Sequence, residues 1–392
     1  MIHLHYGSDY LKRIKSSGWV LFALLLTSLY GGLLRFYKLG QQSFWMDEVF
    51  STVHAKAILL HGHPLLENGL TSWDYFITHY ITALGLSLFY DVQYGARFFS
   101  AIAGTLSIPV FFFVCLKLSR SKYIALVSTL LLTFMTYEIA WCRQVRGYIF
   151  LQLFSFISIA CFIEYLQKKK IWWMILSLVF VIFSLITHRA GYLVFTFIIV
   201  LGFVELYRHR RLLMNVKQKN YIQVVCITGV FFIFFIFLFL QNTNSNIYDS
   251  LKDLISPPSN SFILPYIEFI YRIFKVILLW SLIGVFFSII KKDRYNICLF
   301  CTIGLYFFAI LFQTPYFHYR YLLPIIPFIL YFAALGFLFL IENGIKFHKR
   351  VFDYFLITII FVFSVFSMDW NIRPYHKYYL GITAPQPEWK EA

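Results

Sequence analysis

The chain has 392 residues, of which 60% are hydrophobic, 21% are aromatic and only 13% are charged, and its formal net charge is +16. This composition excludes an ordinary soluble domain, in which about a quarter of the residues are charged. We therefore interpret the chain as an integral membrane protein, and we read its excess of Lys and Arg as a marker of membrane orientation that implies no nucleic acid.

Apolar runs long enough to cross a bilayer recur along the whole chain. A spanning helix needs roughly 20 mostly apolar residues, because lipid offers no partners to free backbone N–H and C=O groups. The sequence predicts eleven such helices, of which the eighth begins with an interfacial part: 18–35, 97–116, 123–141, 148–166, 171–188, 190–207, 221–240, 264–290, 295–313, 321–341 and 351–368. The predicted fold class is all-α, a polytopic membrane helix bundle.

Lys and Arg are distributed unevenly between the loops of this predicted bundle. Alternate short loops carry most of them, namely the N-terminal arm, 117–122, 168–170, 208–219, 291–294 and 346–350. Short basic loops remain in the cytoplasm, so we expect a multi-pass protein of the cell membrane with a cytoplasmic N-terminus. The long segment 36–96 and the tail 369–392 are then extracytoplasmic. The first apolar run lacks a following cleavage site, and we expect it to be retained as a helix.

The predicted organisation is a single membrane domain over residues 1–368, with 36–96 as its first outer loop. Six cysteines lie in or beside apolar runs. The pair Cys298 and Cys301 has the C-x-x-C spacing, but no second pair accompanies it, so packing between helices explains it better than a metal site. The sequence predicts no metal ligands.

Four polar clusters stand at helix ends on the predicted outer face. They are Asp47 and Glu48, Arg143 and Arg146, His188 and Arg189, and His318 and Arg320. Charges near a membrane core are costly and usually find partners or line a path. Carboxylates together with Arg and His suit a substrate whose anionic head group lies there while its tail lies in lipid, because the planar guanidinium fork matches phosphate.

Each cluster also has a structural interpretation. Asp47 and Glu48 could be solvated loop residues, although the flanking "FW" and "VF" are apolar. Arg143 and Arg146 could be anchors that extend to lipid head groups. His188 and His318 could be packed histidines at helix ends, and the aromatic residues nearby are typical of any membrane interface.

An ordered set of motifs resembles a known family. The stretches "FWMDEVFS", "YGARFFSAIAGTLSIPVFFF", "CRQVRGY", "THRAGY" and "HYRYLLPIIPF" are similar to glycosyltransferase family 39, the ArnT and protein-mannosyltransferase-like membrane transferases, and the similarity covers nearly the whole chain. The resemblance implies the GT-C fold, in which the first outer loop contains short amphipathic helices. It also implies transfer of a sugar from a polyprenyl-phosphate carrier to an acceptor on the outer face.

The resemblance further implies roles for individual residues. Asp47 would be the essential carboxylate, with Glu48 beside it, and the donor phosphate would lie near Arg143, Arg146, His318 and Arg320. Further site candidates are Tyr148, His188, His63 and Asp74. The chain departs from the family at "TSWDYFITHY", which leaves the roles of Asp74 and His79 open, and at Gln144, where many members have Glu. The tail "APQPEWKEA" is expected either to end the protein or to begin a soluble outer domain.

The chemistry of such a transfer explains a carboxylate outside the first helix. A polyprenyl phosphate leaves as a stable anion, so a general acid is not needed, unlike in hydrolysis of an ordinary glycoside. We expect Asp47 to take the proton of the acceptor hydroxyl during an inverting attack, while Glu48 positions Asp47 or the acceptor. The alternative function is a transporter or flippase of lipid-linked sugars. Metal dependence, the sugar (a hexose or a pentose) and the acceptor (lipid, glycan or protein) stay open.

Overall fold

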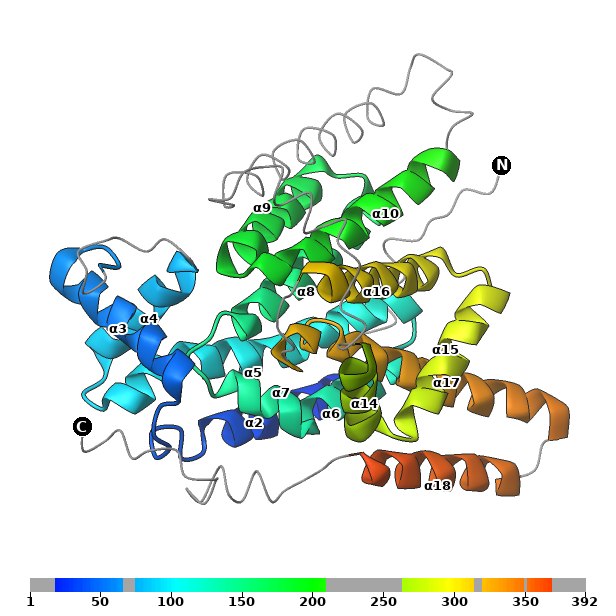
Figure 1. The fold of residues 1–392 in the computed structure, drawn as a ribbon. Coiled ribbons are helices and arrows are strands. Elements are labelled where there is room, and N and C mark those ends of the chain that lie inside the picture. The colour runs from blue at the N-terminus through cyan, green and yellow to red at the C-terminus, as the bar shows by residue number, and fades with distance from the viewer. Residues whose placement is uncertain (1–17, 66–74, 209–262, 314–318, 349–350, 369–392) are drawn as a thin grey trace, which may run out of the picture.

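The computed structural model describes residues 18–65, 75–208, 263–313, 319–348 and 351–368. Every regular element in these ranges is a helix, and Figure 1 shows them as one bundle with a smaller helical hairpin at one end. The helices are α2 (Gly18–Phe36), α3 (Met46–His61), α4 (Phe76–Leu88), α5 (Val92–Ser119), α6 (Lys122–Phe134), α7 (Thr136–Cys142), α8 (Tyr148–Lys168), α9 (Ile171–Thr187), α10 (Tyr192–Arg208), α14 (Ile263–Phe274), α15 (Ile277–Ile290), α16 (Arg294–Gln313), α17 (Ile326–His348) and α18 (Val351–Ser367), with short 3-10 turns η1 (Arg189–Gly191) and η2 (Tyr319–Leu322).

Helices cover each predicted span that falls in the described ranges, which confirms the all-α membrane fold class. Four of them, α2, α5, α8 and α16, are individually long and apolar enough to cross a bilayer. Two further candidates are bent pairs: α6 and α7 meet at 65°, and α14 and α15 meet at 100°. The second bend agrees with the expected interfacial start of the span 264–290. The span 221–240 and the tail 369–392 lie outside the described residues, so the total of eleven stays a prediction.

Local sequence signals mark where several helices begin or end. The Asp91 side chain accepts a hydrogen bond from the backbone N–H of Tyr94 at 2.8 Å and caps α5. Gly62 ends α3 in the left-handed conformation at φ 79°, which glycine adopts without steric cost. The residue Met135 separates α6 from α7, and its backbone φ and ψ are extended, so the chain changes direction there.

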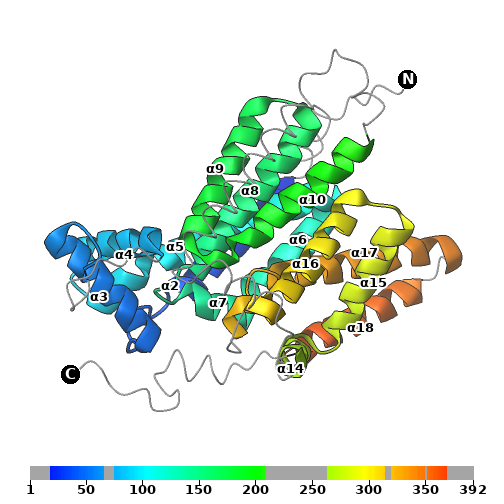
Figure 2. The same ribbon diagram turned by 45° about the horizontal axis from the view of Figure 1, so that its top comes forward.

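Glycines allow the close contacts that fix the hairpin α3–α4 to the bundle. A Cβ on Gly85 of α4 would stand 2.2 Å from the carbonyl oxygen of Gly95 in α5, so both helices need glycine at this crossing. The hairpin lies at the end of α5 in both views (Figures 1 and 2). This hairpin belongs to the predicted outer loop 36–96, and it brings the first turn of α3 to the same end of the bundle as the starts of α5 and α8.

Candidate active site

Asp47 forms the centre of an ion cluster contributed by three distant segments. Its Oδ2 lies 3.4 Å from Nη2 of Arg146 and forms an ion pair with Nη1 of Arg320. The Asp47 side chain is 24% exposed, and each arginine side chain is 19% exposed. The carboxylate and both guanidiniums are therefore partly desolvated but remain open to a ligand.

Three local structures hold these side chains in place. Asp47 occupies the first turn of α3, where a negative charge is favourable to the helix dipole. Arg146 lies in the short connection from α7 to α8, next to Gly147, where an added Cβ would stand 2.8 Å from the carbonyl oxygen of Thr187. Arg320 belongs to η2, and the following Leu322 and Leu323 are fully buried and anchor that turn.

The cluster carries one positive charge in excess, because two guanidiniums face a single carboxylate. Burial by itself would lower the pKa of Arg320, but Tyr148 and Asp47 outweigh burial and hold that pKa above its usual value. Arg320 is thus a permanent cation. Among the described residues, Nε of Arg320 and Nε1 of Trp45 are buried N–H groups without a hydrogen-bond partner. They are donors that an anionic or hydroxylated ligand could use.

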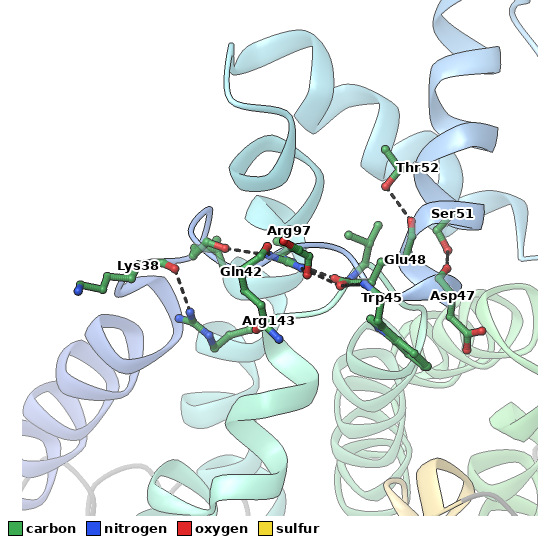
Figure 3. A network of polar contacts seen from close by, with 12 residues as sticks. Lys38, Gln42, Trp45, Asp47, Glu48, Ser51, Thr52, Arg97 and Arg143 are labelled. Carbon is green, nitrogen blue, oxygen red and sulfur yellow. Dashed lines mark hydrogen bonds and ion pairs between the residues drawn. The ribbon is translucent and has the colours of Figure 1, made fainter. Parts of the chain in front are cut away.

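Glu48 has a different environment from its neighbour Asp47. Its side chain is 1% exposed and accepts two hydrogen bonds from Arg97, from Nε at 2.8 Å and from Nη2 at 2.7 Å. The backbone N–H of Val145 also donates to Glu48 at 3.0 Å. Figure 3 shows Asp47 on the other side of the same helical turn, pointing away from Arg97. We call this buried Glu48–Arg97 ion pair the clamp, because it joins α3 to α5. Both oxygens of its carboxylate accept hydrogen bonds from Arg97.

The Arg97 guanidinium also binds the segment that precedes α3. Its Nη1 donates to the carbonyl oxygens of Leu39 and Gln42, at 3.2 Å and 2.7 Å, and its Nη2 donates to that of Ser43 at 3.2 Å. Arg97 thereby connects α5, the 39–43 loop and the first turn of α3. Sequence analysis missed this residue, although a charge at the start of the second apolar run, in "YGARFF", was a usable signal.

Arg143 lies away from the ion cluster in spite of its position near Arg146. Its Nη1 donates to the carbonyl oxygens of Arg35 at 3.0 Å and Tyr37 at 2.6 Å, and its Nη2 donates to that of Lys38 at 3.2 Å. These carbonyls belong to the C-terminal end of α2, where an arginine satisfies acceptors that lack a helical partner. Figure 3 shows Arg143 beside Lys38, with its hydrogen bond to the Lys38 carbonyl oxygen drawn as a dashed line.

An aromatic group borders the cluster. The His188 ring stacks on Tyr75, with ring centroids 5.1 Å apart, and lies 4.2 Å from the Tyr148 ring. Nδ1 of His188 accepts a hydrogen bond from the backbone N–H of Ala190 at 3.0 Å, so a neutral His188 carries its proton on Nε2. Tyr148 packs with Trp141 and Leu323, and Trp45 packs on this group. The structure thus brings Tyr148 near Arg320 and Arg146, and the His188 ring packs against Tyr148.

His63 is the one further predicted site residue that the structure describes, and it is not part of this arrangement. His63 follows α3, where its Nδ1 lies 2.9 Å from the carbonyl oxygen of His61. Asp74 and His318 lie outside the described residues. In the described ranges no group of three or more His, Cys, Asp and Glu residues could hold a metal ion. Two guanidiniums next to Asp47 also make this donor set unsuitable for a divalent cation.

A family model matches residues 25–249 of the chain, and its description is dolichyl-phosphate-mannose-protein mannosyltransferase. The match contains the Asp47, Glu48, Arg97 and Arg146 positions. An uncharacterised protein of Aquifex aeolicus is 25% identical over 286 residues, which are 66% of this chain and 57% of that protein.

Solved structures with the same fold include two transferases captured with lipid carriers. An archaeal oligosaccharyltransferase, AglB from Archaeoglobus fulgidus, in complex with an inhibitory peptide and a dolichol-phosphate, aligns with a TM-score of 0.61 at 11% identity, over 95% of this chain and 61% of that one. ArnT from Cupriavidus metallidurans bound to undecaprenyl phosphate aligns with a TM-score of 0.58 at 15% identity, over 82% and 60%. These matches confirm the GT-C fold, and the chain spans about six-tenths of the length of these proteins.

Proposed function

The chain belongs to the dolichyl-phosphate-mannose-protein mannosyltransferase family, and on this premise we propose that it is a membrane glycosyltransferase that uses a polyprenyl-phosphate-linked sugar. The sugar passes to an acceptor hydroxyl on the extracytoplasmic face of the cell membrane. The observation that carries the proposal is the ion cluster of Asp47, Arg146 and Arg320, in which a carboxylate and two guanidiniums share one partly exposed site.

The charge of the cluster suits a phosphodiester donor. The excess positive charge of Arg146 and Arg320 over Asp47 matches the single negative charge of a sugar joined to a lipid through one phosphate. Arg320 offers its free Nε as well as its terminal nitrogens, so it can bind phosphate through two parallel hydrogen bonds. Charge that builds on the leaving phosphate is then stabilised at a preorganised site, an effect that is often the largest in catalysis.

Asp47 is the general base in this proposal. The acceptor oxygen attacks the anomeric carbon while its proton passes to the Asp47 carboxylate, and the bond from that carbon to the phosphate oxygen breaks. The electron pair leaves with the polyprenyl phosphate, and the configuration at carbon is inverted. Asp47 can reach the acceptor because one quarter of its side chain is exposed, whereas the Glu48 carboxylate is enclosed.

The geometry supports the expected positioning role of Glu48 and a revised role for Arg143. We assign Glu48 to positioning: it holds Arg97 and the N–H of Val145, and so it joins the loop before Asp47 to the connection that carries Arg146. We assign Arg143 to closing the end of α2 and no longer to the donor phosphate. Tyr148 and His188 stay candidates for contact with the donor, since Tyr148 lies near Arg320 and Arg146 and the His188 ring packs against it.

Purified protein in vesicles tests the proposal directly. Labelled mannosyl and glucosyl polyprenyl phosphates are supplied with a membrane extract as the acceptor source, and we expect acid-labile label in the donor to become acid-stable label in a product. Release of polyprenyl phosphate should accompany the transfer. If labelled donor instead crosses the bilayer unchanged and no product forms, the chain is a transporter of lipid-linked sugars, the alternative from sequence.

A further inference from the structure

A second group of opposite charges lies inside the membrane bundle, apart from the ion cluster. Arg35 in the last turn of α2 and Glu138 in the first turn of α7 are both 0% exposed. The Cys142 thiol lies between them: its Sγ accepts a hydrogen bond from Nε of Arg35 at 3.3 Å and donates to Oε1 of Glu138 at 3.6 Å. Nε2 of Gln152 in α8 donates to the same Glu138 oxygen at 2.7 Å. We call these four side chains the core network, because they join α2, α7 and α8.

Glycines make room for the core network. A Cβ on Gly104 of α5 would lie 2.3 Å from Sγ of Cys142 and 3.2 Å from Nε of Arg35, so this close approach requires glycine. A Cβ on Gly31 would lie 3.3 Å from Nη1 of Arg35, and that nitrogen donates to the Gly31 carbonyl oxygen at 3.0 Å. The packing of α2 and α5 is therefore shaped around the buried guanidinium.

The core network is not the most stable way to fill this part of the interior. Removal of charges from water is costly, and apolar replacements of a buried ion pair are often neutral or stabilising. Among the described residues, Oε2 of Glu138 and Oε1 of Gln152 are also buried acceptors without a hydrogen-bond partner, and such groups cost further free energy. Charged residues inside a membrane domain usually have a function for this reason.

The core network holds α7 at a bend. Helix α7 leaves α6 at 65°, so a continuous helix does not set its direction. Arg35 contacts both sides of the bend, since its Nη1 donates to the carbonyl oxygen of Thr133 in α6 at 3.5 Å and its Nε donates to Cys142 at the end of α7. Arg143, directly after α7, donates in return to the Arg35 carbonyl oxygen at 3.0 Å. The last turns of α2 and α7 thus hold each other in both directions.

The connection that follows α7 leads to the ion cluster. The N–H of Val145 donates to Glu48 at 3.0 Å, and Nη2 of Arg146 lies 3.4 Å from Oδ2 of Asp47. Only three residues separate Cys142 from Arg146. A rotation or shift of α7 consequently moves Arg146 relative to Asp47.

We propose that the core network positions Arg146 for the donor phosphate, with Arg35 and Glu138 as positioning residues that act through α7. This inference rests on the proposed function, since it concerns the same site. Neither side chain contacts the donor. Attraction between the two charges across the Cys142 thiol sets the direction of α7, whereas an apolar contact in its place would not, because apolar burial is non-directional.

Cysteine variants break the core network with the smallest change in packing. Cys142→Ala removes the thiol between the charges, whereas Cys142→Ser leaves a hydroxyl that donates and accepts in its place. Cys161→Ala is the matched control, because Cys161 is a buried cysteine of α8, 4% exposed, that lies outside the network.

Hydrogen exchange of the backbone amides, read by mass spectrometry, measures the position of the connection without requiring activity. In Cys142→Ala the segment 143–147 should exchange roughly tenfold faster, the effect of weakening its hydrogen bonds. Cys142→Ser and Cys161→Ala should exchange this segment at the rate of the unmodified protein. Unchanged exchange in Cys142→Ala, or an equal effect of Cys161→Ala, would overturn the proposal.

Donor kinetics separate positioning from stability. The double variant Arg35→Met with Glu138→Gln leaves no unpaired buried charge, so its Tm in detergent should stay close to that of the unmodified protein. Its KM for labelled mannosyl polyprenyl phosphate should nevertheless rise roughly tenfold, because Arg146 is no longer held in place. A normal KM, whatever the Tm, would show that the network only supports the fold and would contradict the proposal.

The cysteine pair gives the same kinetic test if the double variant does not fold. Cys142→Ala should raise the KM for the donor, and Cys142→Ser should return it to the value of the unmodified protein. Equal, normal KM values for both would again overturn the proposal. If the unmodified protein consumes no donor, the proposed function fails, whereas the exchange result on the segment 143–147 stands independently.

Discussion

Two ion clusters at opposite ends of α8 have the same balance of charges but are formed by different residue types and different kinds of segment. Near the start of α8, Asp47 faces Arg146 and Arg320; we call this group the outer cluster, after the face on which we propose that it lies. Near the end of α8, Glu164 forms ion pairs with Lys117 of α5 and with Lys168, one turn further along the same helix; we call this group the inner cluster. Each cluster is one carboxylate between two cations, and in each the carboxylate is the less abundant charge.

The differences between the clusters separate structure from chemistry. Lys168 and Glu164 are neighbours at i and i+4, and Lys117 comes from a helix already packed on α8, so the inner cluster needs no special loop. The outer cluster is made from a helix start, a tight connection and a 3-10 turn, and it uses guanidinium forks where the inner one uses ammonium groups. Holding side chains from three distant segments together costs conformational entropy. We infer that the outer cluster is retained because it binds substrate.

Loss of the outer carboxylate should have the largest effect. Asp47→Asn keeps the shape of the side chain but removes its proton affinity, so the turnover number for sugar transfer should fall by about 10²–10⁴-fold. Expression and binding of labelled donor should be nearly unchanged, as measured by filtration of detergent-solubilised protein. Normal turnover by Asp47→Asn would remove Asp47 from the mechanism.

Loss of one partner of the clamp should mainly destabilise the protein. Arg97→Met leaves the Glu48 carboxylate buried without its cation, which typically costs about 3–5 kcal/mol. The double variant Glu48→Gln with Arg97→Met should recover part of that loss, because no unpaired charge remains. Thermal unfolding in detergent measures both. Equal stability of the single variant and the unmodified protein would show that the pair is not a structural clamp.

Replacement of a guanidinium by an ammonium should weaken donor binding at the outer cluster. Arg320→Lys keeps the charge but loses the paired hydrogen bonds to phosphate, so the KM for the donor should rise roughly tenfold with a smaller change in kcat. Arg272→Lys is the matched control, since Arg272 forms an exposed surface pair with Glu268 at 2.9 Å. An equal, negligible effect of both changes would make Arg320 an interfacial anchor.

The smallest effect is expected at the inner cluster. Glu164→Gln removes the ion pairs with Lys117 and Lys168, which are 23% and 32% exposed, and should cost no more than about 1 kcal/mol. The rate of sugar transfer should not change, because this cluster holds two helices together far from Asp47. A loss of turnover comparable to that of Asp47→Asn would contradict the distinction between the two ends of α8.

The sequence predicted the membrane bundle and the family well. Long apolar runs have no alternative to helix in lipid, so helix positions such as 18–35 and 148–166 agree with α2 and α8 within a few residues. The GT-C fold and the family, inferred from ordered motifs, are confirmed by the comparisons. Helix bends were harder to predict from the sequence, because the break at Met135 between α6 and α7 lies inside one continuous apolar run.

The candidate site was only partly visible in the sequence. Helix ends and charge patterns located Asp47, Arg146 and Arg320 on one face, and the structure brings these three together. The same reasoning grouped Arg143 with Arg146, although its contacts are with α2, and passed over Arg97. The choice between these arginines depends on which carbonyls and carboxylates lie nearby, and those partners are about 50 to 110 residues away in the chain.

What the sequence by itself determined is the medium and the class of chemistry. Apolar length fixes a membrane bundle, and an acidic pair after the first helix with arginines at later helix ends indicates a charged site, because such groups are costly near lipid. Only the tertiary structure decided that Asp47 is open and Glu48 enclosed. These neighbours differ by about 100° around the axis of α3, so one turns to Arg146 and Arg320 and the other to Arg97, and that direction is set by packing against α5.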